Sequence, residues 1–300
     1  MKVMPPPWAC VTGVAPSWNV AAYPAQMTPG DPATEPNESE DETQPAGLSI
    51  TLISVWAWFV FGACVIVWVP MMAIVWLVTL PFDRARWWVG YLYRKMPVAV
   101  QRLNPLWNFT VSGTMPADPR NPYVAVSNHE SFVDILLISH VKWEMKWLCK
   151  KEMFKIPVAG WLLWLSGDIP LERGDKESAQ KAMDLCKVSL DRNVSVMIFP
   201  EGTRSTTSEM RPFKEGAFRL AIETQVPVLP MVVHGARNAL RKHDWRFGRV
   251  HAEVRVLDPI PTEGLTTDDI DDLCARVRAV IAAERDVLIA EARVAAAAEG

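Results

Sequence analysis

The stretch Tyr123-Val-Ala-Val-Ser-Asn-His-Glu-Ser-Phe-Val-Asp-Ile-Leu-Leu-Ile138 decides how this chain is organised. Its first four residues form an apolar run after Asn121-Pro122, a pattern that predicts a short buried strand. Residues 132–138 are mostly apolar over a length that fits a short helix, so they predict a helix. The sequence therefore predicts a strand, a turn and a helix in direct succession.

His129 and Asp134 lie five positions apart in this stretch. On a continuous helix, two such side chains would point about 140° apart and could not meet. We therefore expect His129 in the turn before the helix and Asp134 in its first turn, reaching back. An imidazole can take a proton from an alcohol when a second group fixes its tautomer. This pattern predicts a general base with its orienting carboxylate.

The same residues admit a structural interpretation. Ser131-x-x-Asp134 fits a capping box, with Ser131 as the N-cap and an acid at the third helical position. From the residues alone, catalysis and capping both stay open for Asp134. A metal site is not predicted, because no second histidine stands at ligand spacing from His129.

A second polar turn follows about seventy residues later. Residues 194–199 are strand-like, and Pro200-Glu-Gly-Thr-Arg-Ser205 turns out of them. Gly202 allows the backbone to approach a ligand closely. Arg204 offers a planar fork suited to phosphate oxygens, the alternative being a solvated surface arginine.

Two weaker blocks complete a series of four. Gly167-Asp-Ile-Pro-Leu-Glu-Arg173 places another arginine after a short extended run. Val226-Pro-Val-Leu-Pro230 leads into residues 231–233, a predicted buried strand bounded by prolines. In order and wording, the four blocks resemble those of the glycerolipid acyltransferase family, in particular its bacterial 1-acylglycerol-3-phosphate acyltransferases. The resemblance covers roughly residues 50–263.

The resemblance implies an activity and a set of roles. His129 would be the base and Asp134 its partner. The block at 226–230 would help to form the acyl-donor site or its floor. The acceptor's glycerol phosphate would be held by the remaining block residues, namely Arg173, Glu201, Gly202, Thr203 and Arg204. The implied reaction moves a fatty acyl group from acyl-CoA or acyl-ACP to the free hydroxyl of lysophosphatidic acid, giving phosphatidic acid.

The remaining chemistry of the chain agrees with direct transfer. The sequence has no Gly-x-Ser-x-Gly elbow, which disfavours a serine hydrolase or phospholipase. Attack by a substrate hydroxyl on a thioester needs a base, a positioning site and oxyanion stabilisation. No cofactor is expected beyond the acyl-CoA or acyl-ACP co-substrate. Another lyso-lipid acceptor, such as a lyso-ornithine lipid, and a catalytically silent lipid-binding homologue remain the alternatives.

Composition limits the partners and the compartment. The net charge of −3 gives no basic excess, so nucleic acid is not an expected partner. The five cysteines are scattered with no C-x-x-C pair, consistent with a reducing compartment and no disulfide framework.

A long apolar run predicts a membrane anchor. No charged residue occurs from Leu48 to Phe82. Its first 22 residues, 48–69, would span about 33 Å as a helix, against a bilayer core of roughly 30 Å. Pro70 predicts a kink, and spanning and half-inserted arrangements both stay open. The alternative is a fully buried core helix.

Basic and aromatic residues follow the apolar run, as expected at a headgroup interface. The basic residues of this region are Arg84, Arg86, Arg94 and Lys95. Since acidic residues precede the run and basic ones follow it, the positive-inside rule predicts the cytoplasmic face of the cell membrane. Residues 142–151 also interleave basic and aromatic residues, which fits either headgroup contact or an amphipathic strand with a solvated face.

We therefore predict an α/β fold, a mixed sheet flanked by helices, with an N-terminal hydrophobic anchoring segment. The expected divisions are a disordered Pro-rich and acidic tail (1–47), the membrane-anchoring helical segment (48–103), the catalytic domain (104–263) and a C-terminal helix (264–300). Alternation over residues 250–256 predicts a half-exposed strand. In the C-terminal helix, one face is expected to consist of Ile270, Leu273, Val277 and Ile281.

Overall fold

The computed structural model describes residues 47–205, 209–240 and 244–299, so all of the predicted tail except Gly47 lies outside the described residues. The described residues form a mixed sheet of seven strands in the order β1-β7-β6-β2-β5-β3-β4. Neighbouring strands are parallel except β6 and β7, which are antiparallel. The strands are β1 Trp107–Gly113, β2 Val124–Ser127, β3 Met145–Lys150, β4 Ile169–Leu171, β5 Ser195–Ile198, β6 Val228–His234 and β7 Val250–Val256.

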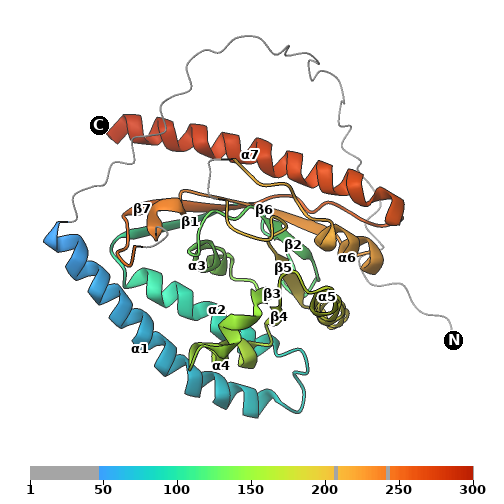
Figure 1. The fold of residues 1–300 in the computed structure, drawn as a ribbon, viewed down its shortest axis with the longest axis horizontal. Coiled ribbons are helices and arrows are strands. Elements are labelled where there is room, and N and C mark those ends of the chain that lie inside the picture. The colour runs from blue at the N-terminus through green and yellow to red at the C-terminus, as the bar shows by residue number, and fades with distance from the viewer. Residues whose placement is uncertain (1–46, 206–208, 241–243, 300) are drawn as a thin grey trace, which may run out of the picture. The chain divides into compact units, whose positions relative to one another are not determined.

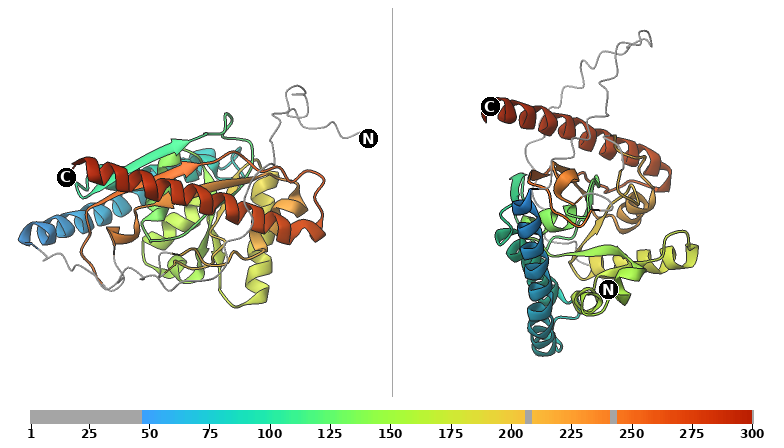
Figure 2. Two further views of the ribbon diagram at one scale, coloured as in Figure 1. Left: turned by 90° about the horizontal axis from the view of Figure 1, so that it is seen from above. Right: turned by 60° about the vertical axis from the view of Figure 1, so that its left-hand side comes forward.

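Helices cover both faces of this sheet (Figures 1 and 2). Side chains of α5, α6 and α7 pack with Val124 and Val126 of β2 on one face. The intervening Ala125 packs on the other face, together with α3, and α1, α2 and α4 share an adjoining cluster. The helices are α1 Leu48–Thr79, α2 Trp87–Arg102, α3 Asp134–Ile138, α4 Ala159–Ser166, α5 Lys176–Asp191, α6 Gly216–Thr224 and α7 Ile270–Glu299. The predicted mixed sheet flanked by helices is confirmed.

Burial of the strands follows their position in the sheet. The central parallel strands β2 and β5 are buried at every residue, as expected for strands covered on both faces. Strand β7 alternates buried with more exposed residues, as predicted for 250–256. Pro230 differs from the expectation, because it lies inside β6 rather than at its edge. It is tolerated there because pairing with β7 begins only at Met231.

Helix α1 is the predicted apolar segment. It runs for 32 residues, about 48 Å, and continues through Pro70. It is long and apolar enough to cross a membrane, by length and composition, and only 22% of its most apolar window is buried. One side, including Ala57 and Met72, packs against the protein, whereas Phe59, Ile66 and other large apolar side chains are exposed. A fully buried core helix is therefore excluded.

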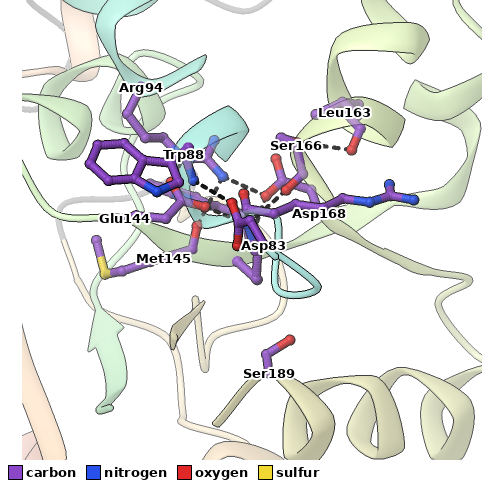
Figure 3. Close-up of polar contacts among 12 residues, drawn as sticks. Asp83, Trp88, Arg94, Glu144, Met145, Leu163, Ser166, Asp168 and Ser189 are labelled. Atoms are coloured by element: carbon purple, nitrogen blue, oxygen red, sulfur yellow. Dashed lines mark hydrogen bonds and ion pairs between the residues drawn. The ribbon is translucent and has the colours of Figure 1, made fainter. Parts of the chain in front are cut away.

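Arg94 does not face a headgroup layer, and this corrects the sequence prediction. Its guanidinium is 4% exposed and pairs with Asp168 and Glu144 (Figure 3). Lys146 pairs with the same Glu144 at 2.7 Å. The four charges lie on α2, on and just before β3, and after α4, so they join the α1–α2 region to the sheet.

Residues 142–151 decide between the two predicted alternatives in favour of a strand, although its side chains are more buried than expected. Their middle part is strand β3, which lies between β5 and β4. Trp143, Lys146 and Trp147 are buried, so these side chains cannot contact lipid headgroups. The sequence pattern did not show that Lys146 is buried. A buried lysine needs a partner, and the carboxylate of Glu144 provides it inside the protein.

The C-terminal helix follows the prediction. A short 3-10 turn, Thr267–Asp269, carries a capping box between Thr266 and Asp269 and leads into α7. The predicted apolar face is buried, with Ile270 at 4% exposure and Ile281 at 0%. Helix α7 lies along one face of the sheet and contacts β6 and α6 (Figure 2).

Candidate active site

His129 and Asp134 meet where strand β2 gives way to helix α3. His129 follows the last residue of β2 by two positions, and Asp134 is the first residue of α3. The imidazole Nδ1 lies 2.8 Å from the carboxylate oxygen Oδ2. The predicted geometry, a turn histidine with an aspartate reaching back from the first helical turn, is confirmed.

One oxygen of Asp134 makes both the contact with His129 and the contacts of a cap. Besides the imidazole, Oδ2 accepts hydrogen bonds from the backbone N–H groups of Glu130 (2.7 Å) and Ser131 (2.9 Å). The reciprocal half of a capping box is not formed, since the Ser131 hydroxyl accepts instead from Val133 N. Pairing with His129 and capping of the turn are thus one interaction, and neither excludes the other.

This contact also fixes which imidazole nitrogen is available. An ionised carboxylate can only accept, so Nδ1 carries the proton that it donates to Asp134. In the neutral imidazole, the other nitrogen, Nε2, is therefore the one that can accept a proton. The His129 side chain is 11% exposed and Asp134 is fully buried. The imidazole is therefore partly open to solvent, while its partner is shielded from water.

Two residues that the sequence did not single out hold His129 in place. The ring of Phe199 stacks on the imidazole, with centroids 3.9 Å apart and planes 14° from parallel. The Asn128 side chain donates to Val233 O and accepts from Val233 N, both at 2.9 Å. The side chain of Asn128 thereby continues the hydrogen bonding between β2 and β6 beyond the last residue of β2. A polar residue directly after a buried strand was the only available signal.

Glu201 braces the same turn from the end of β5. Its carboxylate accepts from His129 N at 2.8 Å and from Arg211 N at 3.0 Å. Burial raises the pKa of this carboxyl, and the two backbone donors partly offset the effect. Both Glu201 oxygens are thus bonded to the protein itself. Contact of Glu201 with the acceptor stays a prediction, whereas its bond to the backbone of His129 is seen directly.

The turn after β5 presents two cationic side chains. Gly202 has φ +71°, a conformation that favours glycine, and a Cβ there would meet the Lys214 ammonium at 2.8 Å. Arg204 is exposed, and Thr203 is half-buried. The sequence analysis missed Lys214, which approaches Gly202 because its backbone N–H donates to Pro200 O. Arg204 and Lys214 therefore offer positive charge on the turn that braces His129.

Arg173 reaches the same edge of the sheet from further away. It follows β4 and is exposed. Since β2, β5, β3 and β4 are parallel, residues after their carboxyl ends share one edge. Strand β4 lies two strands from β5, roughly 10 Å across the sheet. The block at 226–230 instead lies mostly within β6, where Val228 and Leu229 are buried against β2.

The C-terminal helix contacts the residue that follows His129. Arg285 of α7 lies 3.2 Å from the Glu130 carboxylate, and both side chains are largely buried. Burial and the nearby Asp134 raise the pKa of the Glu130 carboxyl, and Arg285 opposes this shift. Within the described residues, no cluster of three or more His, Cys, Asp or Glu side chains could hold a metal ion.

The region that holds this site matches a known protein family. The family model described as Acyltransferase matches residues 108–234, which include the β2–α3 turn and the β5 turn. A 1-acyl-sn-glycerol-3-phosphate acyltransferase of Haemophilus influenzae is 34% identical over 178 residues, covering 58% of this chain and 73% of the relative. The chain belongs to the 1-acyl-sn-glycerol-3-phosphate acyltransferase family.

Two further proteins show how much of the chain is shared with known acyltransferases. Human 1-acyl-sn-glycerol-3-phosphate acyltransferase alpha is 39% identical over 170 residues, which are 56% of this chain. The match spans about 60% of the human protein's length. The crystal structure of the acyltransferase PlsC from Thermotoga maritima has a TM-score of 0.69 and 23% identity, and covers 81% of this chain and 97% of its own. This chain therefore has the same fold as that structure.

Asp134→Asn separates the charge of this residue from its shape. An amide oxygen can still accept from the backbone, but it no longer stabilises a protonated imidazole. We expect the turnover of the acyltransferase reaction to fall by about 10²-fold or more. The free energy of unfolding should change by about 1 kcal/mol or less. Asp269→Asn is the matched control, because Asp269 accepts from Thr266 N in the cap before α7. Equal activity of the two variants would contradict a role for Asp134 in the reaction.

Proposed function

We propose that this protein transfers a fatty acyl group from a thioester to the free hydroxyl of lysophosphatidic acid, producing phosphatidic acid. The observation that carries the proposal is the His129–Asp134 pair, held at 2.8 Å beside a turn that presents Arg204 and Lys214. The names of the Haemophilus and human relatives support the same acceptor. Both acyl-CoA and acyl-ACP fit as donors, and no other cofactor is proposed.

The geometry supports a direct transfer. Nε2 of His129 takes the proton of the acceptor hydroxyl, whose oxygen attacks the thioester carbonyl carbon. The new C–O bond forms, the C–S bond breaks, and the thiolate leaves with the proton returned by the imidazolium. Asp134 stabilises that imidazolium throughout, since its carboxylate faces Nδ1. Arg204, Lys214 and Arg173 are proposed to hold the acceptor's phosphate.

Arg204→Lys tests the phosphate site. Lysine keeps the charge and loses the planar fork that binds two phosphate oxygens. We expect the apparent affinity for lysophosphatidic acid to fall about tenfold or more, with little change for the thioester. The assay uses membranes, both donors and a panel of lyso-acceptors, and Arg219→Lys on α6 is the control. Preference for a lyso-lipid without a phosphomonoester would favour the alternative acceptor.

The proposed location is the cytoplasmic face of a membrane. The acceptor is a lipid, so the site must lie near the headgroup plane, and the exposed apolar side of α1 offers the means of insertion. Arg84 and Arg86 in the α1–α2 connection, and Lys95 within α2, remain for contact with anionic headgroups, each worth roughly 1 kcal/mol.

Fractionation of cells tests this location. We expect the full chain to sediment with membranes and to stay there through high-salt and carbonate washes, because apolar insertion does not depend on surface charge. Release by carbonate alone would show that charge holds the protein. Recovery in the high-speed supernatant without detergent would exclude the anchor. Protease access in inverted and right-side-out vesicles then reports the face.

A further inference from the structure

A cavity lined by basic side chains lies at the edge of the sheet opposite to the edge that carries His129. Its volume is about 410 Å³, and its walls include Lys146 near the start of β3, Ile169 at the start of β4 and Arg192 shortly before β5. His129 and Glu201, by contrast, follow the carboxyl ends of β2 and β5. Because β5, β3 and β4 run parallel, this cavity and the candidate active site lie at opposite ends of the strands.

Three arginines line the cavity without a carboxylate partner among the described residues: Arg84 and Arg86 from the α1–α2 connection, and Arg192 from the end of α5. Arg192 Nη1 donates to Arg84 O at 2.9 Å, which ties the two segments together. The Arg86 guanidinium lies over the Trp164 ring, 4.8 Å from its centroid. Burial lowers the pKa of Arg86, as expected for a cation without a counter-ion.

The acidic groups nearby are already engaged. Asp168 lines the cavity, but its carboxylate is bonded to Arg94 and to Trp147 N. Asp83, in the connection itself, accepts from Trp88 N at the start of α2. The ammonium of Lys146 is bonded to Glu144, Ser166 O and Arg86 O. The arginines thus leave the cavity with unmatched positive charge.

The surroundings of the cavity are apolar and exposed. Trp164 (53% exposed), Leu185 (47%) and Val188 (40%) line the cavity itself, and the exposed Leu80 and Phe82 follow α1 in the same connection as Arg84. We propose that this cavity binds the phosphate of an anionic membrane phospholipid, at a site separate from the one where acyl transfer takes place. Guanidinium forks suit phosphate oxygens, and the apolar rim suits the lipid's glycerol and acyl chains.

The test uses a lipid that is neither substrate nor product of the proposed reaction. Purified full chain in zwitterionic detergent is titrated with phosphatidylglycerol, and native mass spectrometry counts bound lipids. We expect one tightly bound molecule per chain, with affinity reduced at least about tenfold in Arg84→Gln/Arg192→Gln. The control Arg219→Gln/Arg276→Gln, which removes equal charge from α6 and α7, should bind like the parent. Arg84→Glu alone should also lose binding while its melting temperature stays close to that of the parent.

Three outcomes would overturn the proposal. Equal loss in the control pair would indicate diffuse surface charge. Displacement of phosphatidylglycerol by millimolar inorganic phosphate would indicate a site for soluble anions. Loss of binding in Arg204→Lys would place the lipid in the acceptor site instead. Failure of the acyltransferase assay with phosphatidylglycerol binding intact would leave this cavity as a lipid site and refute only the proposed reaction.

Discussion

His129→Ala is expected to reduce acyl transfer by at least about 10²-fold, because it removes the group that accepts the hydroxyl proton. The measurement is turnover at saturating lysophosphatidic acid and thioester. The substitution also removes the partner of the buried Asp134 and the ring stacked on Phe199. Thermal unfolding must therefore be measured in parallel, so that lost activity is not confused with lost protein.

His129→Asn sharpens this experiment. Its amide N–H can still donate to Asp134, but an amide cannot act as a base near neutral pH. We expect the same loss of turnover with a smaller change in stability. His251→Ala serves as the control, since His251 is exposed on β7 and far along the chain from the site. Activity near that of the parent in either His129 variant would refute the assignment of the base.

Gly90→Ala is expected to destabilise the fold strongly. A Cβ at this position in α2 would overlap the Glu144 carboxylate. Glu144 is fully buried and pairs with Lys146 and Arg94, so it has no room to move without breaking these pairs. Disturbing a buried ion pair costs about 3–5 kcal/mol. Thermal unfolding in detergent should show a melting temperature lower by roughly 6–20 °C.

The matched control is Gly62→Ala, in the middle of α1. A Cβ there has no atom within 4 Å. Alanine is favoured over glycine in a helix by up to about 1 kcal/mol, so this variant should melt no lower than the parent. A similar loss of stability in both variants would mean that the Glu144 contact is not the cause.

The sequence predicted those parts of the molecule that depend on local patterns. The apolar run at 124–126 and the spacing of His129 and Asp134 define a strand, a turn and a helix start, because each depends on neighbouring residues. The long uncharged run likewise predicts α1 by composition alone. The face of α7 followed from its helical periodicity.

The rest depends on contacts between segments distant in the chain. Arg94 was assigned to a headgroup layer because no local feature shows that Asp168, 74 residues later, would neutralise it. The stacking of Phe199 on His129 arises because β2 pairs with β5. Such neighbours become visible only once the order of strands is known.

The bond between Arg285 and Glu130 can form only late in the synthesis of the chain. It joins the turn of His129 to a residue 155 positions further on. At a synthesis rate of about 5–20 residues per second, the ribosome needs roughly 8–30 s to travel that distance. During this interval α1 has already left the ribosome and can enter a bilayer, while the turn still lacks its last contact. Under the proposed location, the nascent protein thus reaches a membrane before the turn of His129 gains its contact with α7.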